Sequence, residues 1–316
     1  MGGVIFISFT WFGHNTYIVW NLCLCMAQTT LTNKAPVYPQ GDEESIQAFQ
    51  KFLLAWYEKN ERDLPWRKTR NPYKILVAET MLQQTQIARV IPKYERFLSV
   101  FPLLQDLAEA ETTLLLKEWQ GLGYNRRCLG LRVIAQQIIR DFGGIFPRKY
   151  DRLLELKGIG PYTASALCSF AYNQDVACLD TNVRRVLIHT FTLRENCSQG
   201  ELQRLADLLV PIGRSRVWNN ALMDYGSLQL TAKFTGIQSL GKQSKFEFSK
   251  RWYRSRIVRE VLKVGEISLD ELSVVVERSK EYVRSLVSEL VLEGFLRLEG
   301  ELVGIKEDRF VGGKED

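Results

Sequence analysis

The stretch that decides the fold is Leu156–Ala164, LKGIGPYTA, which lies between two segments of helical periodicity. Gly158 and Gly160 permit positive φ angles and a close approach of another backbone. Pro161 is favoured at the first position of a helix, whose free N–H groups and dipole then face the turn. The segment therefore predicts a helix–hairpin–helix motif that grips a phosphate through its backbone without reading a base.

The chain on both sides of this turn has the periodicity of short helices and almost no strand signals. From Ser45 onward apolar residues recur at three- and four-residue spacing, as in Phe49, Phe52, Leu53 and Trp56. Further helical stretches are expected at about 73–87, 88–100, 103–108, 111–120, 127–142, 151–157, 161–172, 180–191, 199–209 and 214–228. Residues 45–230 therefore predict an all-α domain.

The chain changes character after residue 230. Residues 231–248 mix Gly, Ser, Lys, Gln and Phe without periodicity and predict a linker. Within 249–316 we expect helices over 249–264, from a capping box at 268–271, and over 279–293. Residues 295–298 and 302–305 then flank Glu-Gly-Glu and predict a β-hairpin. Three helices and a hairpin are typical of a small winged-helix-like α+β domain.

Residues 1–44 predict an apolar leader followed by a polar linker. From Val4 to Met26, 16 of 23 residues are apolar, and no Lys or Arg precedes Lys34. That length spans a bilayer, but the positive region of a signal peptide is missing. We expect translation to start at Met26, which leaves 1–25 outside the native protein; a membrane anchor and an ordered soluble segment are the alternatives.

Composition limits the chemistry that the chain can perform. Its 316 residues have a net charge of +6, with 46% hydrophobic and 25% charged residues, as in a globular protein of about two domains. The two histidines, His14 and His189, argue against a His-rich metal site and a Ser-His-Asp triad. The six cysteines include no CxxC pair, so zinc-ribbon spacing is absent. We expect no metal site, and acid–base chemistry that depends on carboxylates.

Two acidic residues are candidate catalytic groups. Glu79 lies in the otherwise apolar helical segment Ile75–Leu82, where burial raises the pKa of a carboxyl group, as general acid catalysis needs. A helix carboxylate that faces solvent is the alternative. Asp180 is expected to be a helix N-cap, and a capping carboxylate at a buried edge can also face a developing cation. Spacing along the chain does not show whether the two carboxylates meet.

Six segments, in order along residues 45–230, match a known family. They are Leu64–Arg67, Glu79–Gln86, Gly121–Tyr124, Leu156–Tyr162, Leu179–Val186 and Met223–Gly226. In these motifs the chain resembles the helix–hairpin–helix DNA glycosylases, and among them the MutY-type adenine glycosylases. The resemblance implies a mainly α helix–hairpin–helix DNA glycosylase fold, to which the small winged-helix-like domain is appended.

The resemblance assigns the chemistry to three residues. Glu79 matches the general acid that protonates the leaving adenine, Asp180 the carboxylate that stabilises the positively charged sugar, and Tyr162 a tyrosine that hydrogen-bonds in that site. An oxocarbenium-like sugar needs a nearby anion, and adenine leaves poorly unless it is protonated. Bifunctional relatives of the endonuclease III type carry a lysine nucleophile at the Tyr162 position. We therefore expect a monofunctional glycosylase without efficient strand cleavage.

The resemblance also implies contacts with DNA. An extruded base leaves a gap, and Gln83 and Gln84 match the family's wedge region, while Tyr124 matches an aromatic inserted beside the partner base. The alternatives are a polar helix face and a packed tyrosine. In the same way Gly158 and Gly160 are expected to hold a DNA phosphate.

Four further residues complete the predicted site. Trp66 and Arg67 match the wall of the adenine pocket. Arg126 and Arg127 follow the Gly-Leu-Gly-Tyr turn and are candidate phosphate contacts, with an exposed charge pair as the plainer interpretation.

The chain departs from the family in its cysteines. Most members carry four cysteines after the segment that matches 223–226, and these bind a [4Fe–4S] cluster. Here residues 227–233 contain no cysteine, and none follows Cys197. We therefore expect no cofactor, and expect Leu228 and Leu230 to help to pack this region instead.

The second departure is the C-terminal domain. Well-known members carry a Nudix-like domain that recognises 8-oxoguanine, whereas residues 249–316 here predict a winged helix. Its first helix carries Lys250, Arg251, Arg254, Arg256 and Arg259, a density that suits phosphate contact or a solvated basic face. The exchange puts 8-oxoguanine selectivity in question.

Together these observations predict a monofunctional DNA glycosylase of base excision repair that removes adenine mispaired with 8-oxoguanine or guanine. A glycosylase for T·G or U·G mismatches is one alternative, and a DNA-binding protein without catalysis on the same scaffold is another. The expected partner is double-stranded DNA with mismatched or oxidised bases. We expect a monomer with no membrane partner, located in the cytoplasm with the nucleoid.

Overall fold

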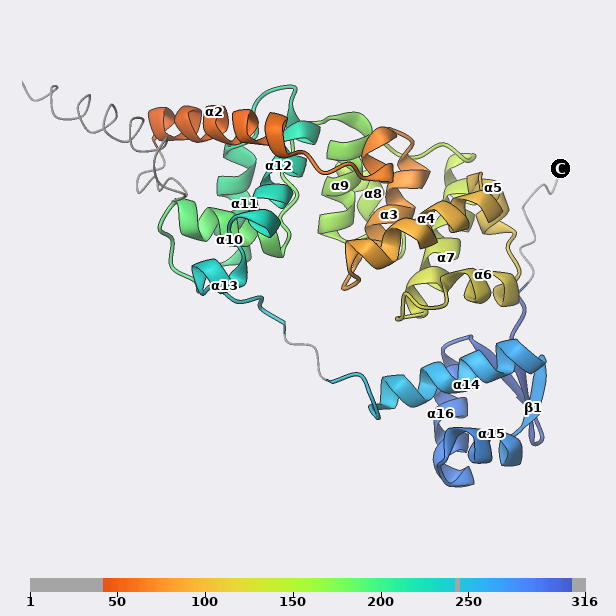
Figure 1. Ribbon diagram of the computed structural model, residues 1–316. Coiled ribbons are helices and arrows are strands. Elements are labelled where there is room, and N and C mark those ends of the chain that lie inside the picture. The colour runs from red at the N-terminus through yellow and green to blue at the C-terminus, as the bar shows by residue number, and fades with distance from the viewer. Residues whose placement is uncertain (1–41, 242–244, 309–316) are drawn as a thin grey trace, which may run out of the picture.

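The computed structural model describes residues 42–241 and 245–308 (Figure 1). The predictions made for the leader, including the start at Met26, fall outside these residues. Within them, the region up to residue 241 is helical: α2 (Glu43–Asn60), η1 (Pro65–Lys68), α3 (Pro72–Leu82), α4 (Ile87–Val100), α5 (Leu104–Ala108), α6 (Thr112–Trp119), α7 (Arg126–Phe142), α8 (Tyr150–Leu154), α9 (Pro161–Tyr172), α10 (Thr181–Thr190), α11 (Gln199–Leu208), α12 (Ser215–Leu228) and α13 (Ala232–Thr235).

These helices form two lobes, each with its own apolar core. Helices α3 to α9 surround buried residues such as Val77 and Trp119, and α2 with α10 to α12 surrounds Phe49 and Trp218. Figure 1 shows α2 and α10–α13 on one side and α3–α8 on the other. The chain crosses between the lobes after α2 and again after α9, so each crossing segment lies at their junction.

Residues 250–305 form the winged-helix pattern. They comprise α14 (Lys250–Val264), β1 (Glu266–Ser268), α15 (Leu269–Val276), α16 (Lys280–Leu292), β2 (Leu296–Glu299) and β3 (Leu302–Ile305). The strands form an antiparallel sheet in the order β1-β3-β2, with Val303 opposite both Ile267 and Leu298. The predicted fold class, mainly α with a small C-terminal α+β domain, is confirmed.

The structure corrects three local predictions. The helix expected over 73–87 ends at Leu82, and the chain turns through Gln84, whose φ of 56° lies in the left-handed region. The segment 231–248, expected to be a linker, contains the short helix α13. Strand β1 gave no sequence signal because three residues are too few to show alternation.

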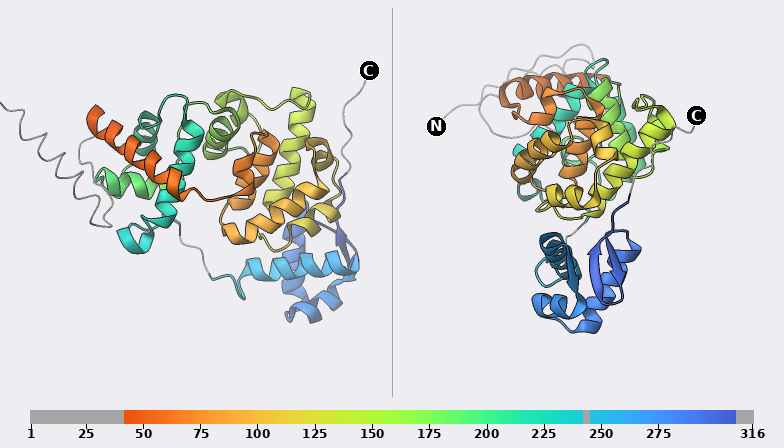
Figure 2. Two further views of the ribbon diagram at one scale, coloured as in Figure 1. Left: turned by 45° about the horizontal axis from the view of Figure 1, so that its top comes forward. Right: turned by 90° about the vertical axis from the view of Figure 1, so that its right-hand side faces the viewer.

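The winged-helix domain shares one cluster of buried apolar residues with the α3–α9 lobe, and hydrogen bonds fasten it at two places. The carboxylate of Glu307 accepts hydrogen bonds from the backbone N–H groups of Thr112 (2.6 Å) and Thr113 (2.9 Å), at the N-terminus of α6. At the other place the guanidinium of Arg251 donates to the hydroxyl of Tyr124. Figure 2 shows from two further directions that this domain lies against the α3–α9 lobe, away from α2.

One glycine fixes how closely α10 and α12 approach. A Cβ atom added at Gly226 would lie 2.8 Å from both the Cβ and the carbonyl oxygen of Asn182. The carbonyl of Gly226 also accepts a 3.0 Å hydrogen bond from Arg185. Only glycine fits this crossing, and the crossing places the beginning of α10, directly after its N-cap Asp180, against α12.

We expect Gly226→Ala to lower the free energy of unfolding by about 1–3 kcal/mol, because a methyl group overpacks the crossing. Urea denaturation measures the change. Gly130→Ala is the matched control, since Gly130 lies inside α7 with open space around its Cα, and alanine there should be neutral or stabilise the protein by up to about 1 kcal/mol. Equal effects of the two substitutions would contradict the proposed close approach.

Candidate active site

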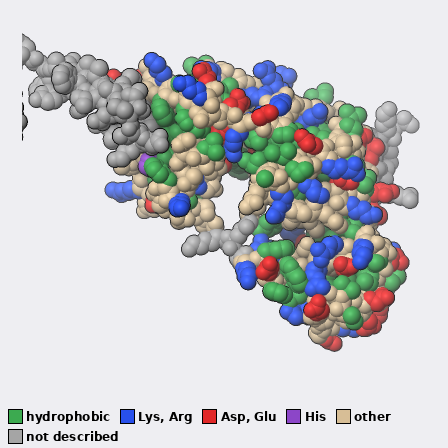
Figure 3. Space-filling view, viewed as in Figure 1, with side chains coloured by type: hydrophobic (Ala, Val, Ile, Leu, Met, Phe, Trp, Pro, Cys, Tyr) green, Lys and Arg blue, Asp and Glu red, His purple; other side chains and the backbone are tan. Residues whose placement is uncertain are grey.

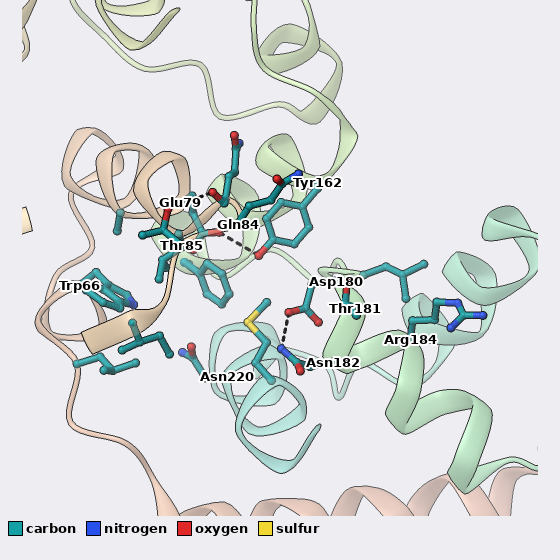
Figure 4. A pocket seen from close by; sticks show the side chains of 18 of the residues that line it. Trp66, Glu79, Gln84, Thr85, Tyr162, Asp180, Thr181, Asn182, Arg184 and Asn220 are labelled. Atoms are coloured by element: carbon teal, nitrogen blue, oxygen red, sulfur yellow. Dashed lines mark hydrogen bonds between the residues drawn. The ribbon is translucent and has the colours of Figure 1, made fainter. Parts of the chain in front are cut away.

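A cavity of about 600 Å³ opens at the junction of the two lobes. Its walls come from η1, the C-terminal part of α3, the beginnings of α9 and α10, and α12 (Figure 4). Six predicted site residues that lie far apart in the sequence line it together with Gln84: Trp66, Arg67, Glu79, Gln83, Tyr162 and Asp180. The size and the mixture of apolar walls with a few polar groups suit a small planar ligand.

Glu79 is a buried carboxyl group of α3, with only 7% of its surface exposed. Its Oε2 accepts a 2.9 Å hydrogen bond from the hydroxyl of Tyr162, at the beginning of α9. Burial, with a smaller contribution from the charge of Asp180, raises the pKa of Glu79 to about 7, although the hydrogen bond from Tyr162 acts in the opposite direction. The alternative of a solvent-facing carboxylate is excluded, and Glu79 can give up a proton near neutral pH.

Asp180 caps α10 and faces the same cavity (Figure 4). Its carboxylate accepts a 2.7 Å bond from the backbone N–H of Val183 and a 3.1 Å bond from the side-chain amide of Asn182. Burial raises the pKa of Asp180, while these donors favour its ionised form. Capping and facing the cavity are therefore compatible, and the carboxylate has more donors than that of Glu79.

Two arginines that line the cavity, Arg62 and Arg67, form ion pairs with one buried carboxylate. The fully buried carboxylate of Asp224, on α12, accepts two hydrogen bonds of 2.7 Å from the guanidinium of Arg67 and a 2.6 Å bond from Nε of Arg62. Burial would raise the pKa of Asp224, but these arginines bring it below its ordinary value. Arg67 thus lines the cavity as predicted, but its guanidinium is committed to Asp224.

Sequence reasoning missed Asp224 as a structural residue, although it lies in the matched segment Met223–Gly226. The signal was an acidic residue within the locally apolar run 221–226, similar to the signal that singled out Glu79. Trp66 lies as expected in the cavity wall, and its ring packs edge-on against Tyr94 with the ring centroids 5.5 Å apart.

The predicted wedge residues lie at the mouth of the cavity. Gln83 and Gln84 form the turn after α3 and are exposed. Tyr124 also has a left-handed backbone, with φ of 47°, and its ring lies between the guanidinium groups of Arg127 and Arg251 at 5.5 and 5.4 Å. Both turns project from the α3–α9 lobe, and neither lies inside a regular helix.

Arg127 corrects a prediction, because its guanidinium faces protein and not solvent. Nη1 and Nη2 donate to a ring of oxygens from two turns: the carbonyls of Thr80, Met81, Gln83, Leu122 and Gly123, and the hydroxyl of Thr85. A phosphate contact needs these donors, so Arg127 instead joins the wedge turn to the loop that carries Tyr124. Arg126, its neighbour, is exposed and lies 3.7 Å from Glu293.

The hairpin between α8 and α9 has the expected positive φ angle at Gly158 but not at Gly160, whose φ is −95°. Gly158 has φ of 105°, and Ile159, between the two glycines, is buried as an anchor with 5% exposure. Gly160 is the N-cap of α9 and supplies no side-chain cap, while Pro161 begins the helix. The first N–H groups of α9 are thus left for an external acceptor.

The donor set after α12 does not fit an iron–sulfur cluster. Residues 227–241 contain no cysteine, and the four described thiols lie earlier in the chain, three of them buried. Leu230 is fully buried and packs in the core of the α2 lobe, as expected; Leu228 is 47% exposed and does not. Arg185 donates to the carbonyl of Leu230 (3.1 Å) and Arg184 to that of Gln238 (3.4 Å), so protein contacts secure this segment.

Two further features concern metal binding and membrane crossing. Within residues 42–241 and 245–308, no three His, Cys, Asp or Glu side chains are grouped so as to bind a metal ion. In the same part of the chain, no helix combines the length and the apolar character needed to cross a membrane.

Comparison with known proteins identifies the fold family. The family described as HhH-GPD superfamily base excision DNA repair protein matches residues 77–211. The solved structure of a thermostable thymine-DNA glycosylase is 31% identical, with a TM-score of 0.55, over 58% of this chain and 87% of that chain. The chain belongs to the HhH-GPD superfamily.

Relatives of this HhH-GPD protein also confirm the resemblance to MutY-type proteins. Adenine DNA glycosylase of Buchnera aphidicola subsp. Baizongia pistaciae is 37% identical over 183 residues, 57% of this chain and 52% of the relative. That of Mycolicibacterium smegmatis is 39% identical over 184 residues, 57% of this chain and 63% of the relative. The match thus spans about half to two thirds of these two relatives.

Arg127→Lys should lower the free energy of unfolding by about 2 kcal/mol, because lysine keeps the charge but cannot reach both turns with a planar fork. Thermal or urea denaturation measures it. Arg126→Lys is the matched control at the neighbouring exposed position and should change stability by less than about 0.5 kcal/mol. If both substitutions are neutral, Arg127 does not join the turns.

Proposed function

We propose that this protein is a monofunctional DNA glycosylase of base excision repair, which hydrolyses the N-glycosidic bond of adenine mispaired with 8-oxoguanine or guanine. The observation that supports it most is that the buried carboxyl group of Glu79 and the half-buried carboxyl group of Asp180 line one cavity. Relatives at 37–39% identity are named adenine DNA glycosylases.

The two carboxyl groups have the different environments that base release needs. Glu79, with a pKa near 7 and a single hydrogen-bond donor, is protonated on a large fraction of molecules at neutral pH and serves as the acid for the leaving base. Asp180 receives two donors at the positive end of α10, which favour its anion. The anion stabilises the positive charge that develops on the sugar.

The surroundings of the cavity suit an extruded nucleotide. Trp66 supplies an aromatic wall, and Gln83 and Gln84 stand at the mouth, where the gap in the base stack must be filled. The hairpin at Gly158 and Gly160 would hold a phosphate on the first N–H groups of α9.

The reaction stops at base release because the cavity offers no amine nucleophile. Tyr162 occupies the place where bifunctional relatives have a lysine, and its hydroxyl is hydrogen-bonded to Glu79. The cavity is lined by arginines but by no lysine among the described residues. Schiff-base chemistry and strand cleavage are therefore not expected.

The base preference has a second candidate. The structural relative at 31% identity is a thymine-DNA glycosylase, so removal of thymine or uracil opposite guanine is the alternative within the same family. The greater identity to adenine glycosylases favours adenine. The double-stranded DNA partner, the monomeric state and the cytoplasmic location with the nucleoid belong to the same proposal.

Base release under single-turnover conditions tests the proposal on duplexes with A·8-oxoG, A·G, T·G and U·G. We expect release of adenine, and Glu79→Gln should slow it at least about 100-fold while DNA affinity stays within about threefold. Glu58→Gln, an exposed glutamate of α2, is the control and should have no effect. Release of only thymine or uracil would support the second candidate, and no release from any duplex would support a binding protein.

The pH dependence of release provides an independent test. Protonated Glu79 is the active form, so the rate should fall as pH rises through about 7. Tyr162→Phe removes a hydrogen bond that lowers the pKa of Glu79, so the falling limb should move to higher pH. A pH–rate profile of both proteins measures this shift; a limb that stays in place or moves to lower pH would show that Glu79 is not the titrating acid.

A further inference from the structure

A second cavity, of about 900 Å³, lies between the α3–α9 lobe and the winged-helix domain. We call it the interdomain cleft. Helix α4, the loop 120–126 and α14 line it, with smaller contributions from residues 84, 246, 290, 293 and 295. Its charged residues are six cations and one acid: Arg89, Lys93, Arg126, Arg251, Arg254, Arg259 and Glu293.

The interdomain cleft adjoins the active-site cavity at Gln84, the lining residue that the two share. This residue lines both the 600 Å³ cavity and the cleft, and it stands in the exposed turn after α3. A nucleotide that enters the first cavity passes this turn, while the rest of the duplex stays outside it. The cleft therefore adjoins the part of the duplex from which the nucleotide leaves.

Charge is divided unevenly within the winged-helix domain. Helix α14 carries six basic residues and one acidic residue, whereas residues 265–308 carry five basic and eleven acidic residues. Figure 3 shows Lys and Arg side chains on the side of this domain that faces the helical lobes, and Asp and Glu side chains along its outer edge.

The third helix and the wing of this domain are poorly suited to DNA. Two basic residues of α16 are already paired, Lys280 with Asp270 (2.9 Å) and Arg284 with Glu301 of the wing. Glu299 is the last residue of β2, and Glu301 lies in the turn between β2 and β3. A polyanion would be repelled from this acidic part of the domain and attracted to α14, its basic part.

Some cations of the interdomain cleft make contacts within the protein, and others are exposed. Arg254 is held by Glu289 (2.9 Å) and Glu293 (2.6 Å), and Arg251 contacts Tyr124, so both help to attach and shape the domain. The Arg259 side chain is 60% exposed, and its nearest acid, Glu260, lies 3.8 Å away on the same helix. Together with Arg89 and Lys93 of α4, it can reorient toward a phosphate at little cost.

We propose that the interdomain cleft binds the DNA strand opposite the extruded nucleotide, through its phosphates, and that the winged-helix domain contributes α14 and not its third helix or wing. This inference rests on the proposed function, because it takes the 600 Å³ cavity as the site of the extruded nucleotide. The loop with Tyr124 then lies between the two strands, with α4 and α14 on the side of the opposite strand.

The variant Lys93→Gln/Arg259→Gln tests the proposal, with one change on each side of the interdomain cleft. For a 20–30 base-pair duplex we expect the slope of log K against log salt to decrease by about 0.9 for each lost contact, and affinity to fall roughly tenfold per contact at 0.1 M salt. The matched control is Arg284→Gln on α16, which should leave slope and affinity unchanged. Arg89→Gln replaces Lys93→Gln if the double variant has a lower melting temperature than the wild type.

Ethylation of phosphates, one strand at a time, identifies the bound strand. We expect interference at opposite-strand phosphates with the wild type, and its loss at one or two of them with the double variant. Loss only on the strand that carries the extruded nucleotide, or weaker binding by Arg284→Gln alone, would overturn the proposal. These readouts measure binding and not base release, so a failure of the proposed adenine chemistry appears separately, in the base-release experiment.

Discussion

The active-site cavity depends on the interaction of the buried carboxylate of Asp224 with two arginines. This carboxylate lies on α12 in one lobe and holds Arg62 and Arg67, which belong to the segment that crosses to the other lobe. A buried carboxylate is tolerable only with such partners, and removal of one partner from a buried pair typically costs about 3–5 kcal/mol. The same contact thus fixes the position of one lobe relative to the other, and with it the cavity wall that contains Trp66.

Because the relative position of the lobes is fixed, two carboxyl groups from different lobes line one cavity. Glu79 belongs to the core of α3–α9, and Asp180 to the first turn of α10. Glu79 is buried and Asp180 is half-buried, and the number of donors differs: one hydroxyl for Glu79, and a backbone N–H with an amide for Asp180. This difference, and not the residue types, separates an acid from an anion.

Two adjacent arginines of one sequence motif have different environments in the structure. Arg126 and Arg127 are neighbours of the same type, and the sequence offers both as candidate phosphate contacts, with an exposed charge pair as the plainer interpretation. Arg126 is exposed, whereas Arg127 uses its two terminal nitrogens to join two turns of the protein. Periodicity on α7 does not separate these outcomes, because the acceptors come from residues about 45 positions earlier and from the preceding loop. The basic helix α14 divides in the same way, between residues that pair with α16 and residues that face the interdomain cleft.

The sequence by itself determined the helical periods, the Gly-x-Gly hairpin before α9, the three helices and the β-hairpin of the C-terminal domain, and the lack of cysteines after Cys197, because these depend on residue type and local spacing. The tertiary structure alone decided that Glu79 and Asp180 line one cavity, that Asp224 holds Arg62 and Arg67, and that the basic face of α14 lines a cleft that shares Gln84 with this cavity. Those facts depend on contacts between residues up to 162 positions apart, which are set by packing of the lobes and by burial of charge. Local spacing carries no record of either.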